Sequence, residues 1–264
     1  MFAYEFMRTA FVAAFLAAFV CGPVGWFLVL RGQSFASHAL SHVGFAGAAA
    51  ALLWGQPALL GFGLSAVVSG MGMGVASDRV VGRDVMIGLV LSLAMGTGAL
   101  CLHFLTRSAG AATALLFGDI LGISPSSLYW LAALAVGCVA ALAVISRPLL
   151  FASLQPEVAE ARGVNLRLLD VLFLALVGIA SAMCSQITGV LLVFTLMVAP
   201  AAASLRLGFG PMSGMGVAFC LALIEAWGGL YLSWLTDCPA SFWIALLGSV
   251  VFASANGMAH LRGR

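Results

Sequence analysis

The sequence contains no lysine, and all eleven of its basic residues are arginines. A phosphate-binding P-loop requires a lysine, and so does an enzyme that forms a Schiff base with its substrate. Codon bias is enough to explain the absence, but the chemical exclusion holds whatever its cause. The chain therefore cannot hydrolyse ATP through a Walker motif, and any ATP-driven step must come from a partner protein.

Charge of either sign is scarce. Only 8% of the 264 residues are charged, 63% are hydrophobic and the mean hydropathy is +1.16, whereas a soluble domain carries about 25% charged residues. Apolar runs of about 20 residues, each long enough to cross a hydrocarbon core of about 30 Å as a helix, recur along the whole chain. The candidate spans are 9–30, 36–54, 58–77, 85–106, 127–146, 168–187, 189–206, 213–235 and 240–259.

These runs predict an all-α, polytopic membrane bundle of eight or nine transmembrane helices that forms one domain over residues 1–264. The count is least certain between 168 and 206, where two spans are squeezed into a run with almost no polar loop. The net charge of +2 is too small to suggest nucleic acid as a partner. No CxxC motif occurs among the six cysteines, which argues against a zinc knuckle or a disulfide framework.

The distribution of arginine predicts the orientation. If residue 1 starts outside, nine of the eleven arginines face the cytoplasm, as the positive-inside rule requires. Only Arg8 and Arg107 then fall on the outer side. We therefore expect a multi-pass protein of the bacterial cytoplasmic (inner) membrane.

Two connections between spans are unusual. Residues 111–127 are too short and too interrupted by glycine and proline to span, yet too apolar for a free loop, which predicts a re-entrant half-helix. Residues 151–170 hold three acids and two arginines around a short helical stretch at about 156–165. This is the one sizeable cytoplasmic feature, and it predicts a docking element made by Glu157, Glu160, Ala161, Arg162 and Gly163.

Two histidines interrupt the second apolar run. On a helix, Ser34, Ser37, His38, Ser41 and His42 share one face and form a polar stripe. Ionisable groups at membrane depth indicate a functional site, and burial favours the neutral imidazole, which is a metal ligand. Two histidines four apart can converge on one ion, as in HExxH helices, but the glutamate of that motif is missing here. We interpret the pair as a metal-binding site without hydrolytic chemistry; two histidines hydrogen-bonded to a neighbouring helix are the alternative.

Five stretches, in order and spaced over nearly the whole chain, resemble the permeases of ATP-binding-cassette importers for zinc, manganese and iron, the metal-ion ABC-3 type. They are LVLRGQSFASHALSHVGFAG (28–47), LLFGDILGIS (115–124), PEVAEARGVNLRLLD (156–170), TGVLLVFTLMVAPAAASLR (188–206) and GLYLSWLTDCPASFWI (229–244). The resemblance implies a homodimeric permease, a cytoplasmic ATPase dimer docked on the 156–165 helix, and an extracytoplasmic metal-binding protein. It implies no permanently bound cofactor, since the metal ion is the cargo.

One departure from the family bears on the cargo. Many members have an aspartate four residues before the histidine, in a pattern like DAxSH, whereas this sequence has His38 before His42. Two imidazoles shift the preference from manganese toward a borderline-soft ion. We therefore expect Zn²⁺, with Mn²⁺ or Fe²⁺ as the alternatives.

Two acids are further candidates for the ion pathway. Glu225 lies near the middle of a span, where it lines the pathway or forms a protonated contact between helices. Asp237 ends the same span on the outer side, where it attracts a cation or simply marks the helix boundary. Asp119, in the expected re-entrant segment, and His103, near an outer helix end, are weaker candidates.

The leading hypothesis is thus a non-enzymatic permease subunit. A proton-coupled secondary metal transporter is the first alternative, but it would have no need of a docking helix and would carry more intramembrane carboxylates. An intramembrane hydrolase that uses Ser41 with a histidine is the second. It has no GxSG or HExxH motif, and His42 points about 100° away from Ser41 on a helix.

Overall fold

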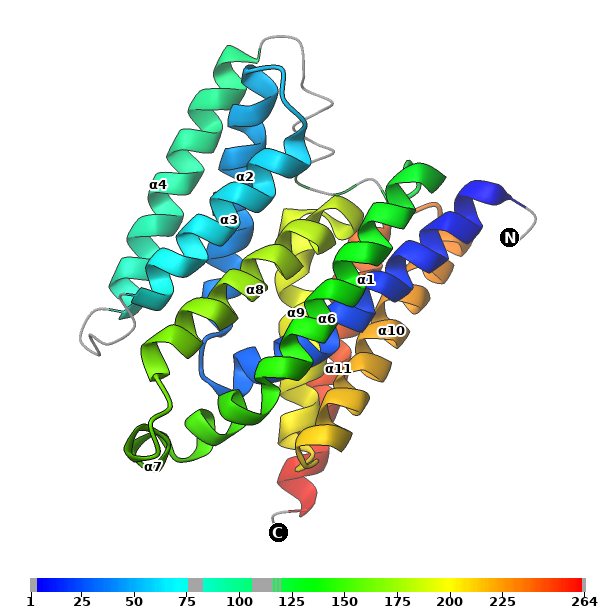
Figure 1. Ribbon diagram of the computed structural model, residues 1–264. Coiled ribbons are helices and arrows are strands. Elements are labelled where there is room, and N and C mark those ends of the chain that lie inside the picture. The colour runs from blue at the N-terminus through cyan, green and yellow to red at the C-terminus, as the bar shows by residue number, and fades with distance from the viewer. Residues whose placement is uncertain (1–3, 76–82, 106–115, 117, 119, 263–264) are drawn as a thin grey trace.

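The computed structural model describes residues 4–75, 83–105, 116, 118 and 120–262, and the regular structure within them is entirely helical (Figure 1). The helices are α1 (Glu5–Leu30), α2 (Ser34–Leu53), α3 (Ala58–Val75), α4 (Arg83–Phe104), α6 (Pro125–Leu154), α7 (Pro156–Ala161), α8 (Leu166–Thr188), α9 (Val190–Arg206), α10 (Pro211–Thr236) and α11 (Ala240–Arg262). The predicted all-α class is confirmed.

Eight of the described helices are long and apolar enough to cross a membrane. The ninth expected span is α9, an apolar helix of 17 residues. It follows α8 through the single residue Gly189, whose φ of 82° and ψ of 159° break the helix in a conformation that glycine adopts without steric cost. The predicted count of eight or nine spans is confirmed, and this glycine explains why the sequence shows no polar loop there.

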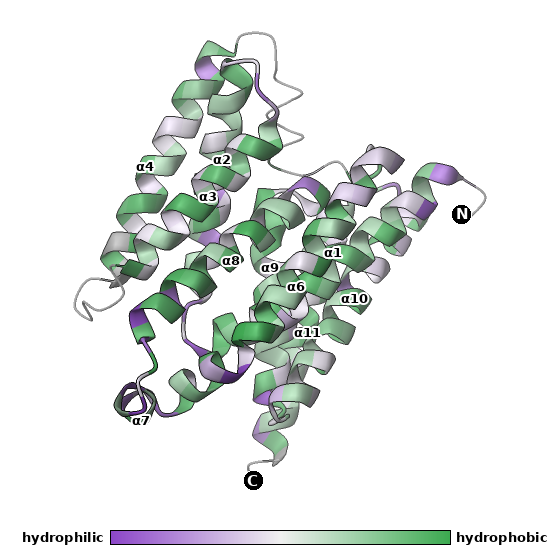
Figure 2. Cartoon of the chain, in the orientation of Figure 1, coloured by the Kyte–Doolittle hydropathy of each residue, from purple (hydrophilic) through white to green (hydrophobic). Residues whose placement is uncertain are grey.

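The helices are arranged around α1. It packs against α6, α8, α9 and α10, while α2, α3 and α4 form a neighbouring group that is attached mainly through α3 on α8 (Figure 1). The helix α7 lies at the same end of the molecule as the C-terminus, and the N-terminus lies at the other end. Hydrophilic residues gather at α7 and near the chain ends, whereas the long helices are hydrophobic (Figure 2). This distribution agrees with the predicted orientation, in which α7 is cytoplasmic.

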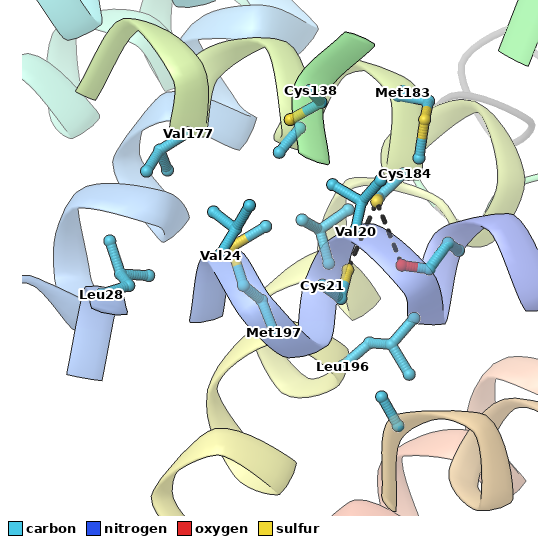
Figure 3. Close-up of a cluster of buried hydrophobic side chains, with 14 of the residues drawn as sticks. Val20, Cys21, Val24, Leu28, Cys138, Val177, Met183, Cys184, Leu196 and Met197 are labelled. Carbon is cyan, nitrogen blue, oxygen red and sulfur yellow. Dashed lines mark hydrogen bonds between the residues drawn. The ribbon is translucent and has the colours of Figure 1, made fainter. Parts of the chain in front are cut away.

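The main core lies where α1, α6, α8 and α9 meet (Figure 3). Val20, Cys21 and Val24 of α1 are fully buried there, beside Cys184 of α8 and Met197 of α9. The Cys21 and Cys184 sulfurs lie 3.3 Å apart as free thiols. The cysteines thus serve here as small apolar packing residues.

Glycines let helix pairs approach closely. A Cβ built on Gly61 of α3 would lie 2.9 Å from the carbonyl carbon of Gly47 in α2, and one built on Gly178 of α8 would lie 2.8 Å from that of Ala66 in α3. Small residues at helix contacts are the usual means of close packing in membranes. They position α2 against α3, and α3 against α8.

Part of the segment expected to be a re-entrant half-helix, residues 111–115, 117 and 119, lies outside the described residues, and Asp119 is among them. Residues 120–124 form a turn and a short irregular stretch, and α6 begins at Pro125. The half-helix therefore stays a prediction.

Candidate functional site

The helix that carries the two histidines begins close to the cytoplasmic end of α1. Three residues, Arg31, Gly32 and Gln33, connect the two helices, and the backbone N–H of Gln33 donates to the carbonyl of Leu28 at 2.9 Å. At a rise of about 1.5 Å per residue, His38 and His42 lie about 6 and 12 Å along α2 from its cytoplasmic end. Both therefore lie in the cytoplasmic half of the predicted membrane span.

Two serines of the polar stripe direct their hydroxyls into their own helix. The Ser37 hydroxyl donates to the carbonyl of Ser34 at 2.8 Å, and the Ser41 hydroxyl donates to the carbonyl of Ser37 at 2.9 Å. Such bonds to the preceding turn satisfy a hydroxyl within its own helix. The hydroxyls of Ser37 and Ser41 are therefore already satisfied within α2.

The two imidazoles lie against each other. Their ring centroids are 4.6 Å apart with an interplanar angle of 83°. His42 is only 4% exposed, whereas His38 is half-buried. The Nδ1 atoms of both rings are buried and have no hydrogen-bond partner. A buried polar atom without a partner is costly, so these two nitrogens are available to a metal ion.

A phenylalanine of α9 covers part of this pair. The Phe194 ring centroid lies 5.4 Å from that of His38 and 6.3 Å from that of Phe35, which is 67% exposed. The pair thus lies between α2 and α9 and reaches the surface of the chain on the side of Phe35. Phe194 carries no local signal in the sequence, because it is an apolar residue in an apolar span.

Within the described residues, the histidine pair brings together two potential metal ligands, His38 and His42. Within the described part of the chain, no group of three or more histidine, cysteine, aspartate or glutamate side chains is placed to hold one metal ion. Glu225 and Asp237 therefore do not join His38 and His42 in one cluster. A tetrahedral metal site takes four ligands, two more than this pair of histidines offers.

Glu225 is fully buried in α10 at the junction with α9 and α11. Neither of its carboxylate oxygens has a hydrogen-bond partner. A Cβ built on Gly248 of α11 would lie 3.1 Å from Oε2 of Glu225 and 2.8 Å from Cγ2 of Thr195 in α9. The carboxyl therefore occupies space that Gly248 leaves open.

Asp237 follows α10 at the outer end of the molecule and adopts a left-handed backbone conformation with φ of 54°. It lines a cavity of about 590 Å³ together with Phe6, Ser233 and Cys238. His103, near the end of α4, packs its ring against Phe104 with the centroids 5.5 Å apart. Neither residue adds a ligand to the histidine pair.

The predicted docking helix is present as α7, although it is shorter than expected. It starts at Pro156 and ends at Ala161 rather than near 165. Gly163, with φ of 83°, ends it, and its backbone N–H donates to the carbonyl of Glu160 at 2.9 Å. Such a left-handed glycine is a common helix terminator, and it turns the chain back toward α8, as the sequence predicted.

The side chains of α7 divide into a buried and an exposed face. Ala159 is fully buried and holds the helix to the bundle, whereas the predicted docking residues Glu157, Glu160, Ala161 and Arg162, together with Gly163, are exposed. The Arg162 guanidinium lies 5.7 Å from the centroid of the Phe151 ring. The exposed face is therefore open to a partner.

An ion pair that the sequence analysis missed joins three helices beside α7. Arg31 pairs with Asp170 of α8 and also donates to the Ser153 hydroxyl of α6 at 3.0 Å. Its guanidinium lies 5.8 Å from the centroid of the Phe173 ring. The pair spans 139 residues of sequence, so no local pattern could have revealed it.

Comparison with known proteins agrees with this arrangement. The sequence profile of the ABC 3 transport family matches residues 3–258. The chain is 32% identical over 256 residues to the probable metal transport system membrane protein of Treponema pallidum, covering 95% of this chain and 94% of the relative. It is 27% identical over 262 residues to the manganese transport system membrane protein MntC of Halalkalibacterium halodurans, covering 97% and 88%.

The fold is also similar to a solved one. A chain of PsaBC from Streptococcus pneumoniae, solved in complex with Fab, matches with a TM-score of 0.85 at 20% identity, covering 96% of this chain and 91% of that one. At this identity the match speaks for the fold alone. With the profile and the sequence relatives, it confirms that the chain belongs to the ABC 3 transport family: it is a multi-pass permease of an ABC metal transporter in the bacterial inner membrane, not an enzyme, and ATP hydrolysis resides in a separate subunit.

Proposed function

We propose that this permease imports Zn²⁺, which His38 and His42 coordinate transiently on its way across the membrane. The observation that carries the proposal is the pair of buried, unpartnered Nδ1 atoms on adjacent rings. Imidazole suits zinc, whereas manganese prefers carboxylate and carbonyl oxygens. Among the described residues, no carboxylate joins the pair, which favours zinc.

A homodimer supplies the missing ligands. The half-buried His38 and the exposed Phe35 mark the side of the pair that is open in one chain. A second copy that meets this face contributes two more imidazoles, which makes a four-nitrogen tetrahedral site with Zn–N distances of about 2.0–2.1 Å. Conduction needs an ion that also leaves easily, so we infer incomplete ligation, with water or Glu225 assisting at one stage.

The exposed face of α7 supports a cytoplasmic ATPase dimer as the partner that drives transport. Glu157, Glu160 and Arg162 offer it charges of both signs, and Ala161 and Gly163 offer a smooth surface that a groove can receive. An extracytoplasmic metal-binding protein delivers the ion at the opposite end, where Asp237 lines the outer cavity.

Manganese is the second candidate cargo, because relatives such as MntC of Halalkalibacterium halodurans are named as manganese transport proteins. The metal preference of one variant, His38→Asp, tests whether the histidine pair selects zinc over manganese. His38→Asp replaces one nitrogen ligand with an oxygen ligand, so it should retain transport and shift the preference toward manganese.

The two alternative functions find less support. A proton-coupled carrier has no use for an exposed docking helix such as α7. An intramembrane hydrolase needs Ser41 to donate to a histidine, but its hydroxyl donates to the carbonyl of Ser37 instead.

Metal accumulation in a bacterial strain that lacks its own zinc importers tests the proposal. The permease would be expressed with its ATPase and binding protein, and zinc and manganese uptake would be measured alone and in competition. His42→Ala should abolish uptake without preventing assembly with the ATPase, whereas the control His103→Ala should transport normally. Normal zinc uptake and selectivity in both His42→Ala and His38→Asp would refute the assignment.

A further inference from the structure

An apolar groove runs along α1, between α6 and α10. It has a volume of about 690 Å³ and is lined by three helices that each contribute mainly apolar side chains, among them Phe27 of α1, Leu142 of α6 and Met215 of α10. Both α6 and α10 pack on α1 (Figure 1), and Phe19, Pro23 and Phe27 of α1 line the groove between them.

One wall of the groove leaves open space at a glycine. A Cβ built on Gly216 of α10 would meet no atom within 4 Å. Next to it, Met212 is 83% exposed. The wall therefore leaves room for a flexible apolar ligand rather than closing onto α1.

The two ends of the groove differ in chemistry. Toward the middle of the membrane, the Phe19 and Phe219 rings meet edge to face with their centroids 6.0 Å apart and close the groove. At the cytoplasmic end lies Arg147, the one charged residue among the residues that line the groove. It comes seven residues before the end of α6, which places it about 10 Å from the cytoplasmic end of that helix.

The charge of Arg147 has no counter-charge among the residues that the structure describes. It is exposed and forms no hydrogen bond or ion pair with another described residue. The neighbouring Ser146 hydroxyl donates to the carbonyl of Ala143 in its own helix at 2.7 Å. The polar end of the groove therefore presents one unpaired guanidinium at the depth of the inner leaflet's head groups.

We propose that this groove is a binding site for an anionic phospholipid of the cytoplasmic leaflet, with an acyl chain along α1 and the phosphate on Arg147. An acyl chain gains little by leaving one apolar environment for another, so the preference must come from the head group. A guanidinium forms two parallel hydrogen bonds with a phosphate, and basic pockets between transmembrane helices on the cytoplasmic side bind anionic head groups. A zwitterionic lipid is bound less well, because its own ammonium offsets the phosphate charge.

A second copy of the chain is a poorer occupant of the groove. No residue of α2 or α9 lines it, so a dimer formed along the face of His38 leaves the groove open to lipid. The inference is independent of the cargo, and it stands whether the permease carries zinc or manganese.

Native mass spectrometry of the full permease, extracted from nanodiscs of phosphatidylglycerol and phosphatidylethanolamine in equal amounts, tests the site. The wild-type chain should retain phosphatidylglycerol about fivefold over phosphatidylethanolamine, since one basic residue near the head groups contributes about 1 kcal/mol. Arg147→Gln should remove this preference. Arg8→Gln, which removes an equal charge from the opposite end of α1, should leave it unchanged.

A second variant tests the apolar part of the site. Gly216→Leu fills the groove where the structure leaves open space, so it should fold and should lower retention of both lipids. An unchanged phosphatidylglycerol preference in Arg147→Gln, or unchanged lipid retention in Gly216→Leu, would overturn the proposal. Oxidative cross-linking of Gly216→Cys between two chains would identify a second copy as the occupant and would overturn it as well.

Discussion

Arg31, which immediately follows α1, forms an ion pair with Asp170 in the first turns of α8. The pair links the residue that leads into the histidine-bearing helix α2 with the helix that leaves α7. Both side chains are nearly buried, with 11% and 12% of their surfaces exposed. The ends of α1, α6 and α8 that lie near α7 are thus held together.

Breaking this pair should destabilise the permease. Asp170→Ala leaves the Arg31 guanidinium largely buried without its carboxylate, which costs on the order of 3 kcal/mol. Thermal unfolding in detergent would show the loss, and Arg31→Ala should show a similar one. In the double variant the two losses should not add, because the pair is lost only once; strictly additive losses would contradict the pairing.

Bulky side chains on the exposed face of α7 should uncouple ATP hydrolysis from transport. Ala161→Trp projects from the exposed side of α7, so the chain should fold and reach the membrane but should no longer seat in the ATPase. Simultaneous measurement of ATP hydrolysis and metal uptake checks this. Ser126→Trp, exposed at the outer end of α6, is the control and should behave as wild type. Coupled transport at the normal rate in Ala161→Trp would exclude α7 as the docking element.

Two glycines of α3 should respond oppositely to the same substitution. A Cβ on Gly70 would lie 2.8 Å from the carbonyl carbon of Leu174 in α8, whereas one on Gly72 would meet nothing within 4 Å. Gly70→Ala forces the helices apart and should cost about 1–3 kcal/mol. Gly72→Ala should be neutral or stabilising by up to about 1 kcal/mol. Equal thermal stabilities of the two variants would show that α3 and α8 are not packed this closely.

The buried carboxyl group of Glu225 should lower the stability of the folded permease but support metal uptake. Its two oxygens are buried without partners, and an apolar side chain of similar size removes that penalty of about 1–3 kcal/mol. Glu225→Leu should therefore raise the unfolding temperature while lowering metal uptake. A less stable variant with normal uptake would instead identify Glu225 as a structural contact between helices.

The features of the fold that depend on short stretches of sequence could be predicted from the sequence alone. Apolar length predicts the spans, the i, i+4 spacing predicts that His38 and His42 share a face, and Pro156 and Gly163 delimit the docking helix. Relationships that depend on packing were not predictable. The Arg31 partner lies 139 residues away, and Glu225 faces α9 and α11 rather than the histidines.

Sharing a helix face with the histidines does not make a serine part of the site, because its hydroxyl can bond within its own helix. Ser37 and Ser41 share the face of His38 and His42, yet their hydroxyls donate to carbonyls of α2 itself. The spacing that places a serine beside a histidine also places it one turn from a backbone acceptor. Only the structure decides between the two.

X-ray absorption spectroscopy of the zinc-loaded permease tests whether His38 and His42 bind the ion. We expect imidazole nitrogens at about 2.0–2.1 Å from the zinc in the wild-type protein and in His103→Ala. We also expect this histidine signature to disappear in His38→Ala/His42→Ala, together with stoichiometric zinc binding. An unchanged spectrum and unchanged zinc content in the double variant would show that the cargo site lies elsewhere.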